Sequence, residues 1–303
     1  MTDTLARPRT DNAALAWIAL AAVGLGWGAA QLLSKIATST GHPALGLTFW
    51  EVAIGAACFT AALVATGGRL PLSRRHLVFY LVCGLAGTAL PNGLSYTSIR
   101  HLPVGVQSMV LSTVPMTTLA LALAIGSERF EPRRLAGIGL GLVAMLMIAL
   151  PEASLPDPGQ APWLILPVIV SLSYAVENVY IDRARPRGAS SLQVMCGLSW
   201  GGLLLITPLM LASGSWIPPV PVGVPEAALA GTALLHVLAY SGFVWLIGHA
   251  GPVFAAQVGY VVTASAVAWG MAVLGERHSA WVWGALAILF AGLALVRPRR
   301  GRG

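Results

Sequence analysis

Residues 13–36 read AALAWIALAAVGLGWGAAQLLSKI, and this stretch decides the fold class. It carries no charged side chain before Lys35. A helix needs about 20 apolar residues to cross the hydrocarbon core of a membrane, so this stretch is long enough. It is also longer than the apolar region of a signal peptide, which has about 7 to 15 residues. The sequence therefore predicts a transmembrane helix that is retained in the mature protein.

Similar apolar stretches follow one another along the chain, separated by short breaks that hold most of the charged residues. Hydrophobic residues make up 56% of the 303 positions and charged residues only 10%, and the mean hydropathy is +0.77. These values lie far from those of a soluble domain. The expected fold is an all-α polytopic membrane protein with ten transmembrane helices, over residues 13–36, 43–66, 76–99, 103–125, 134–150, 162–181, 190–212, 226–247, 251–274 and 279–296.

The basic residues indicate how these helices are oriented. When ten helices are threaded through a membrane, all of the 18 Lys and Arg residues fall on one side except Lys35, Arg100 and Arg277. Cytoplasmic loops carry the excess of Lys and Arg in membrane proteins. An odd number of helices would place one basic terminus on the wrong side. We therefore expect both termini in the cytoplasm.

The same residues argue against several other classes of protein. The net charge of +7 does not indicate nucleic-acid binding, because the Arg residues are scattered through short loops and form no continuous basic surface. Cys58, Cys83 and Cys196 lie in apolar stretches and are odd in number, which argues against a disulfide framework or a metal site. No G-x-x-x-x-G-K-[ST] phosphate-binding loop occurs, so neither ATP nor another cofactor is expected.

The two halves of the chain share landmarks that are 148 positions apart. Each half holds five predicted helices, an odd number, so the second half must enter the membrane from the opposite side. Such inverted repeats place the substrate site near the midplane, between the halves. We therefore expect an inverted repeat of two five-helix halves around a central cavity. The aligned positions are Lys35 with Arg183, Asn92 with Tyr240, His101 with His249, and Glu128-Arg129 with Glu276-Arg277.

Residues 102–148 and 251–296 carry the marks of a known repeat. Each has a Glu-Arg pair between two helices, followed by a Gly-rich helix, and Trp27-Gly28 ahead of Lys35 is similar to the start of that repeat. In these features the chain resembles the EamA family of the drug/metabolite transporter superfamily, and most of all its bacterial amino-acid exporters. The second half departs from the pattern, since Ala175-Val176 stand where Trp27-Gly28 is expected.

The resemblance implies a transporter of the bacterial inner membrane, without catalytic or metal-binding residues. Spans one to four and six to nine would surround the cavity, with spans five and ten as outer supports. The expected parts of the chain are a cytoplasmic tail (1–12), a first five-helix repeat (13–150), a periplasmic linker (151–161), a second repeat (162–296) and a basic cytoplasmic tail (297–303).

Polar side chains at membrane depth are candidates for the cavity wall, because polar groups are costly in lipid and usually functional there. Asn92 follows Pro91, a residue that kinks helices and leaves carbonyls free. Gln31 either binds substrate or bonds a neighbouring helix. Lys35 either binds a substrate carboxylate or reaches the membrane interface.

The second half offers two titratable candidates. Glu177 could bind a substrate ammonium group or carry a proton, or it could pair with a cytoplasmic arginine; Glu51 is a comparable carboxylate. His236 titrates near physiological pH if unperturbed, so it is a candidate for coupling, or else a partner of a neighbouring helix. The full candidate set is Trp27, Gln31, Asn92, Tyr96, Gln107, Tyr174, Glu177, Asn178, His236, Tyr240, Gln257 and Tyr260.

The function that we expect is secondary export of small metabolites, chiefly neutral or aromatic amino acids, by alternating access. Its partners would be the small-molecule substrate and the lipid bilayer. Gly137 and Gly141 form a pair of small residues that could pack helices within one chain or between two chains, so a homodimer is a further alternative. A drug or other metabolite exporter of the same fold is the main alternative. A membrane-embedded enzyme is disfavoured because His236 has no HExxH-like partner and the carboxylates are dispersed. A structural subunit would not need polar faces in both halves.

The orientation can be tested with reporter fusions at Gly303. A reporter that is active only in the cytoplasm should be active there, because the excess of basic residues fixes both termini on that side. Activity of a periplasm-only reporter at the same position would contradict this orientation.

Overall fold

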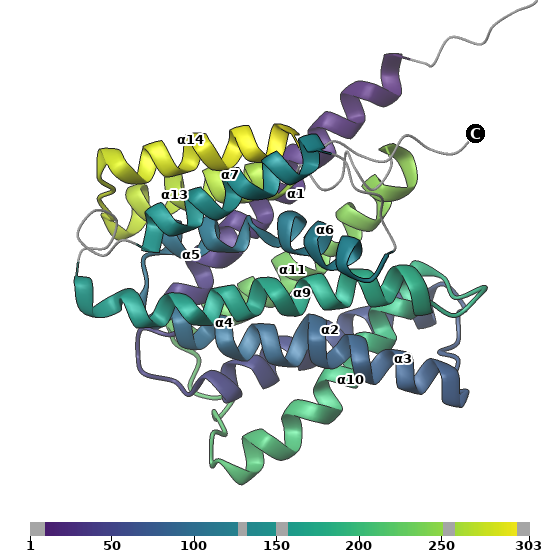
Figure 1. Cartoon of the computed structure of the whole chain (residues 1–303). Coiled ribbons are helices and arrows are strands. Elements are labelled where there is room, and N and C mark those ends of the chain that lie inside the picture. Colours follow the sequence, from purple (N-terminus) through teal and green to yellow (C-terminus); the bar gives the residue numbers. More distant parts are fainter. Residues whose placement is uncertain (1–9, 127–131, 150–156, 251–257, 296–303) are drawn as a thin grey trace, which may run out of the picture.

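A computed structural model of the chain describes residues 10–126, 132–149, 157–250 and 258–295, and every regular element in these residues is a helix (Figure 1). The elements of the first half are α1 (Thr10–Ala37), α2 (Ala44–Ala65), α3 (Arg74–Gly84), η1 (Leu85–Ala89), α4 (Leu90–His101), α5 (Val104–Leu111), α6 (Val114–Ala124) and α7 (Pro132–Ala149). Those of the second half are η2 (Pro158–Leu164), α9 (Ile165–Ala184), α10 (Ser191–Ala212), α11 (Val224–Ala250), α13 (Val258–Leu274) and α14 (Ala280–Leu295).

These helices confirm the expected class of an all-helical, polytopic membrane protein. Six described segments are long and apolar enough to cross a membrane: Ala14–Ala37, Ala44–Ala65, Arg74–His101, Val104–Ala124, Gly159–Ile181 and Ser191–Ala212. Two shorter apolar helices, Val261–Leu274 and Ala280–Gly292, fall within the ninth and tenth predicted spans. The start of the ninth span, residues 251–257, lies outside the described residues. Ten spans remain the predicted number.

The third predicted span is interrupted at mid-length by the π-helix η1. Pro91, just after η1, has no N–H to donate to the carbonyl of Gly87, and its ring crowds that carbonyl. A wide π turn removes the conflict, and such turns are one of the known causes of helix bending. The kink expected at Pro91 is thus a change of helix type over Leu85–Ala89.

Many apolar side chains on these helices point outward. Ile18 on α1, Leu204 on α10 and Leu238 on α11 are 65%, 64% and 67% exposed. Such exposure along whole helices would cost about 25 cal/mol per Å² in water, whereas lipid removes that cost. The buried side chains instead form several separate clusters between neighbouring helices.

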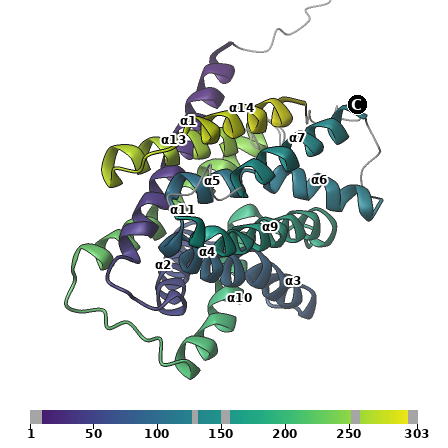
Figure 2. The ribbon, with the colours of Figure 1, turned by 60° about the vertical axis from the view of Figure 1, so that its left-hand side comes forward.

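The helices of the first half pack against those of the second half. α1 contacts α11 and α13, α2 contacts α10 and α11, and α3 contacts α10; α4 and α6 contact α9, α5 contacts α13, and α7 contacts α14. In Figures 1 and 2 the pair α7 and α14 lies along one flank of the molecule and α10 along the opposite flank. The two halves therefore interleave, rather than forming two separate bundles.

Gly28 allows α1 to approach α13 closely. A Cβ atom there would overlap Ser265 Oγ and lie 3.0 Å from the backbone nitrogen of Ala266. Small residues let transmembrane helices pack backbone against backbone. The neighbouring Trp27 faces α11 instead, since its ring contacts Tyr240. The two residues of the Trp27-Gly28 pair thus serve two different helix interfaces.

Gly28→Ala should destabilise the protein, because backbone as well as a side chain must move to accept the methyl group. Overpacking of this kind costs about 1 to 3 kcal/mol, which should lower the Tm of the detergent-purified protein by about 2 to 10 °C. Gly26→Ala on the same helix is the matched control, since its Cβ would meet only Ala239 Cβ at 4.0 Å. Equal Tm values for the two variants would refute the close approach of α1 to α13.

Candidate functional site

Glu51 on α2 is the centre of a polar cluster that joins three helices. Its Oε1 accepts a hydrogen bond from Nδ2 of Asn92 on α4 at 3.0 Å, and the same oxygen lies 2.5 Å from Nδ1 of His236 on α11. An ionised carboxylate can only accept, so Nδ1 of His236 carries the proton and donates. Glu51 is 5% exposed, while the side chain of His236 is 31% exposed. The imidazole Nε2 is therefore free to meet a further group.

Tyr96 extends this cluster by one helical turn along α4. Its ring is buried, and its hydroxyl lies beside Glu51 and Ser34. The hydroxyl makes no hydrogen bond of standard geometry within the described residues. A buried hydroxyl without a partner is costly, so a small shift toward Glu51 or Ser34 is favoured.

An aromatic group lies between α1 and α11. The Trp27 ring meets Tyr240 edge to face, with centroids 5.5 Å apart and an interplanar angle of 89°. Phe243, one turn further along α11, lies 5.4 Å from the same ring. All three side chains are only partly buried, so they offer apolar surface with one hydroxyl at its edge.

Glu177 on α9 is buried against the π-helix. It is 2% exposed, and a Cβ atom on Gly87 would overlap its carboxylate. Its Oε1 has no hydrogen-bond partner among the described residues. No arginine of the described part of the chain forms an ion pair with it, so a structural pairing with the cytoplasmic arginines is not seen there. A carboxylate oxygen without a donor at this depth is costly.

Two tyrosines connect Glu177 to the rest of the site. Tyr174, one turn before Glu177 on α9, is within electrostatic reach of both Glu177 and Glu51. Tyr240 is within reach of Glu177 and contacts Trp27. We call the connected set the central cluster; its members are Trp27, Glu51, Asn92, Tyr96, Tyr174, Glu177, His236 and Tyr240.

A second network lies between α1, α4 and α5. Gln107 is fully buried; its Oε1 accepts from Ser98 Oγ at 2.7 Å, and its Nε2 donates to Gln31 Oε1 at 3.4 Å. Both amides thus take part in helix–helix contacts. Lys35 Nζ donates to the carbonyls of Ile99 at 2.5 Å and Leu102 at 2.7 Å. The ammonium group therefore stabilises the C-terminus of α4.

Five predicted site residues are not members of the central cluster. Two of them, Gln31 and Gln107, belong to the second network instead. Asn178 is exposed, and its Nδ2 donates to Thr118 Oγ1 on α6 at 3.3 Å, although the helical spacing predicts that it shares the face of Glu177. Gln257 lies outside the described residues, as does the side chain of Tyr260. The predicted set in turn lacks Glu51 and Phe243. The charge of Glu51 within an apolar stretch marks it in the sequence, whereas nothing there separates Phe243 from a lipid-facing phenylalanine.

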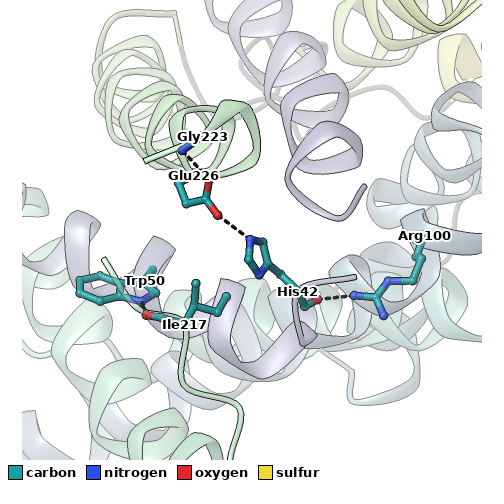
Figure 3. Close-up of polar contacts among 6 residues, drawn as sticks. All are labelled: His42, Trp50, Arg100, Ile217, Gly223 and Glu226. Atoms are coloured by element: carbon teal, nitrogen blue, oxygen red, sulfur yellow. Dashed lines mark hydrogen bonds and ion pairs between the residues drawn. The ribbon is translucent and has the colours of Figure 1, made fainter. Parts of the chain in front are cut away.

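Polar contacts tie together the end of the molecule that is predicted to face the periplasm (Figure 3). His42, between α1 and α2, lies 2.6 Å from Glu226 in the first turn of α11. Arg100 at the end of α4 donates to the His42 carbonyl, and Trp50 donates to the Ile217 carbonyl at 2.9 Å. These contacts join elements of both halves at this end of the molecule.

Glu276 makes a comparable contact on the same side. Its carboxylate accepts from the backbone nitrogens of Val104 at 2.7 Å and Gly105 at 3.3 Å, where a negative charge is favoured by the start of α5. His278 Nε2 lies 3.6 Å from Glu276. Burial lowers the pKa of His278, and the nearby Glu276 opposes this shift only in part. Glu276 thus has a structural role at a helix end, and its partner there is the start of α5.

The described residues hold no group of three or more His, Cys, Asp or Glu side chains that could bind a metal ion. The central cluster instead combines two carboxylates, one imidazole, one amide and four aromatic rings. Such a set can hold a small zwitterionic or polar molecule through hydrogen bonds and cover its apolar part.

Comparisons with known proteins place the chain among membrane transporters. Residues 14–150 match the EamA-like transporter family. The chain is 28% identical to "Uncharacterized inner membrane transporter YedA" of Escherichia coli (strain K12), over 92% of this chain and 89% of the relative. It is 27% identical to "Probable terminal-alkyne amino-acid exporter" of Streptantibioticus cattleyicolor, over 86% of each protein.

A shorter match and a solved structure complete the comparison. "Probable amino-acid metabolite efflux pump" of Salmonella typhimurium is 33% identical over 37% of each chain. A solved structure titled "Crystal structure of protein" shares the fold, with a TM-score of 0.63 at 18% identity over 93% of this chain and 96% of that chain. The relatives are transporters and not enzymes, and this chain is likewise an inner-membrane transporter. Over residues 14–150, this chain therefore carries a domain of the EamA-like transporter type.

Proposed function

We propose that this transporter exports small metabolites, chiefly neutral or aromatic amino acids, by alternating access. The observation that carries the proposal is the central cluster, in which Glu51 is bonded to Asn92 and His236 within predicted membrane spans, and Tyr240, one turn beyond His236 on α11, contacts Trp27. The names of two relatives, an amino-acid exporter and an amino-acid metabolite efflux pump, support the substrate class.

The cluster offers a partner for each part of an amino acid. Glu177, with one oxygen unpaired in the described residues, suits the ammonium group. The amide N–H of Asn92 suits the carboxylate, and so does Nε2 of His236 when the imidazole is doubly protonated and both of its nitrogens donate, because charge-assisted hydrogen bonds are the strong ones. The rings of Trp27 and Tyr240 suit an apolar or aromatic side chain. Since Lys35 is bonded to α4 carbonyls, it is not part of this site.

The proposal includes an inverted repeat, with repeats over residues 13–150 and 162–296, the linker 151–161 between them, and tails 1–12 and 297–303. The pattern of helix contacts supports it. In the order of the predicted spans, α1 corresponds to α9, α2 to α10, α3 and α4 to α11, and α5 and α6 to α13. Under this exchange the α1–α11 contact becomes α9–α4, the α1–α13 contact becomes α9–α6, and the α2–α11 contact becomes α10–α3. All three resulting contacts exist. The α5–α13 and α7–α14 contacts map onto themselves. Such symmetry allows the two halves to close the site alternately from either side.

Transport by reconstituted protein tests the function. Proteoliposomes should take up or exchange labelled neutral and aromatic amino acids. Asn92→Ala should lower the rate by about tenfold or more, as expected for losing a hydrogen bond to a charged group. Tyr240→Ala should also lower the rate, because the substrate side chain loses an aromatic contact. Asn178→Ala is the matched control and should transport normally, because the Asn178 side chain is exposed and bonds Thr118 on α6 instead of a member of the central cluster. Normal rates in both site variants would remove them from the site. A panel in which only cationic drugs move would favour the drug exporter instead.

Glu177 also serves, in this proposal, as the group that carries the proton. Glu177→Gln keeps the shape of the side chain and removes its titration. Accumulation driven by a pH gradient should then fall to the level reached without a gradient, while exchange of labelled for unlabelled substrate continues. Asp157→Asn, at an exposed loop carboxylate, is the control and should keep its gradient dependence. If Glu177→Gln keeps it as well, the proton is carried elsewhere, and His236 becomes the next group to test.

A further inference from the structure

A cavity of about 530 Å³ opens at the start of α3, away from the central cluster. Its lining residues are Arg74, Arg75 and Val78 of α3 and Tyr180 and Ala184 of α9. A volume in this range accommodates a small ligand. Figure 1 shows this end of α3 at the edge of the molecule, beside α9 and α10.

Two unpaired positive charges stand at this cavity. Arg74 and Arg75 are both exposed, and neither makes an ion pair or side-chain hydrogen bond in the described part of the chain. The positive-inside pattern places this end of α3 at the cytoplasmic surface of the membrane. The cytoplasmic leaflet there carries anionic lipid headgroups.

The rest of the cavity wall is apolar and continues into the lipid-facing surface. Val78 lines the cavity and is 47% exposed, and Leu77 and Leu81 on the same helix are 43% and 39% exposed. The Tyr180 ring stacks on Phe79 with centroids 5.8 Å apart, which fixes an aromatic wall below the two arginines. A ligand with an anionic head and an apolar chain matches this site, because two arginines lie next to an apolar surface.

We propose that this cavity binds the headgroup of an anionic phospholipid of the cytoplasmic leaflet. Arg74 and Arg75 hold the phosphodiester, through guanidinium groups whose geometry matches phosphate oxygens. The first part of an acyl chain runs over Val78 and along α3. Basic pockets between transmembrane helices on the cytoplasmic side are known to take up such headgroups.

Lipid binding to the delipidated, detergent-purified protein tests the proposal. Phosphatidylglycerol should raise the Tm and remain bound in native mass spectrometry, whereas phosphatidylcholine should do neither. The double variant Arg74→Gln/Arg75→Gln should lose at least about tenfold in affinity for phosphatidylglycerol, the loss expected from removing charge-assisted hydrogen bonds. The matched control Arg133→Gln/Arg187→Gln removes two exposed arginines of the same predicted membrane face and should bind as the wild type does.

Val78→Trp provides a second test that leaves the charges in place. The larger ring fills the cavity, so the lipid should bind more weakly although both arginines remain. Equal binding of phosphatidylcholine, an equal loss in the control pair, or unchanged binding by Val78→Trp would each overturn the proposal. Equal stabilisation by inorganic phosphate at the same concentration would assign the cavity to free anions instead of lipid.

Discussion

A carboxylate in hydrocarbon must be surrounded by donors, and the Glu51 carboxylate meets this requirement with Asn92 and His236. The three residues come from α2, α4 and α11, so the requirement of one charge fixes the spacing of three helices. Breaking a buried pair by removing one partner is strongly destabilising, because the other group is left unpaired. The side chains of Tyr96, Tyr174 and Trp27 take their places around this fixed point. Rigid support of this kind is what keeps a binding site in register.

The second carboxylate depends on backbone irregularity instead of donors. Pro91 forces a π turn over Leu85–Ala89, and Gly87 within that turn leaves the volume that the Glu177 side chain fills. Non-helical backbone is tolerated at membrane depth only where it is buried in protein or lines a cavity. The π turn in the third span and the buried carboxyl group of Glu177 on α9 therefore depend on each other.

Much of this architecture follows from the sequence, because hydrocarbon allows few solutions. The length of each apolar stretch predicts a helix. The candidate residues chosen within these stretches include every member of the central cluster except Glu51. Side-chain direction is harder to predict. The helical spacing predicts that Asn178 shares a face of α9 with Glu177, yet it bonds to Thr118 on α6. Consecutive residues of a helix point in different directions, so the two neighbours meet different helices. The role of Lys35 depends on where α4 ends relative to α1, which is a tertiary relation that spacing along one helix cannot give.

The interleaving of the two halves also governs how the protein is made. α1 contacts chiefly α11 and α13. It is the first helix to leave the ribosome, and its main partners are synthesised only about two hundred residues later. At about 5 to 20 residues per second, this delay lasts on the order of 10 to 45 s. During that time Gly28, which packs against α13, must contact lipid or proteins of the insertion machinery. A ribosome that stops before α11 therefore leaves a nascent chain whose first helix lacks both of its main partners.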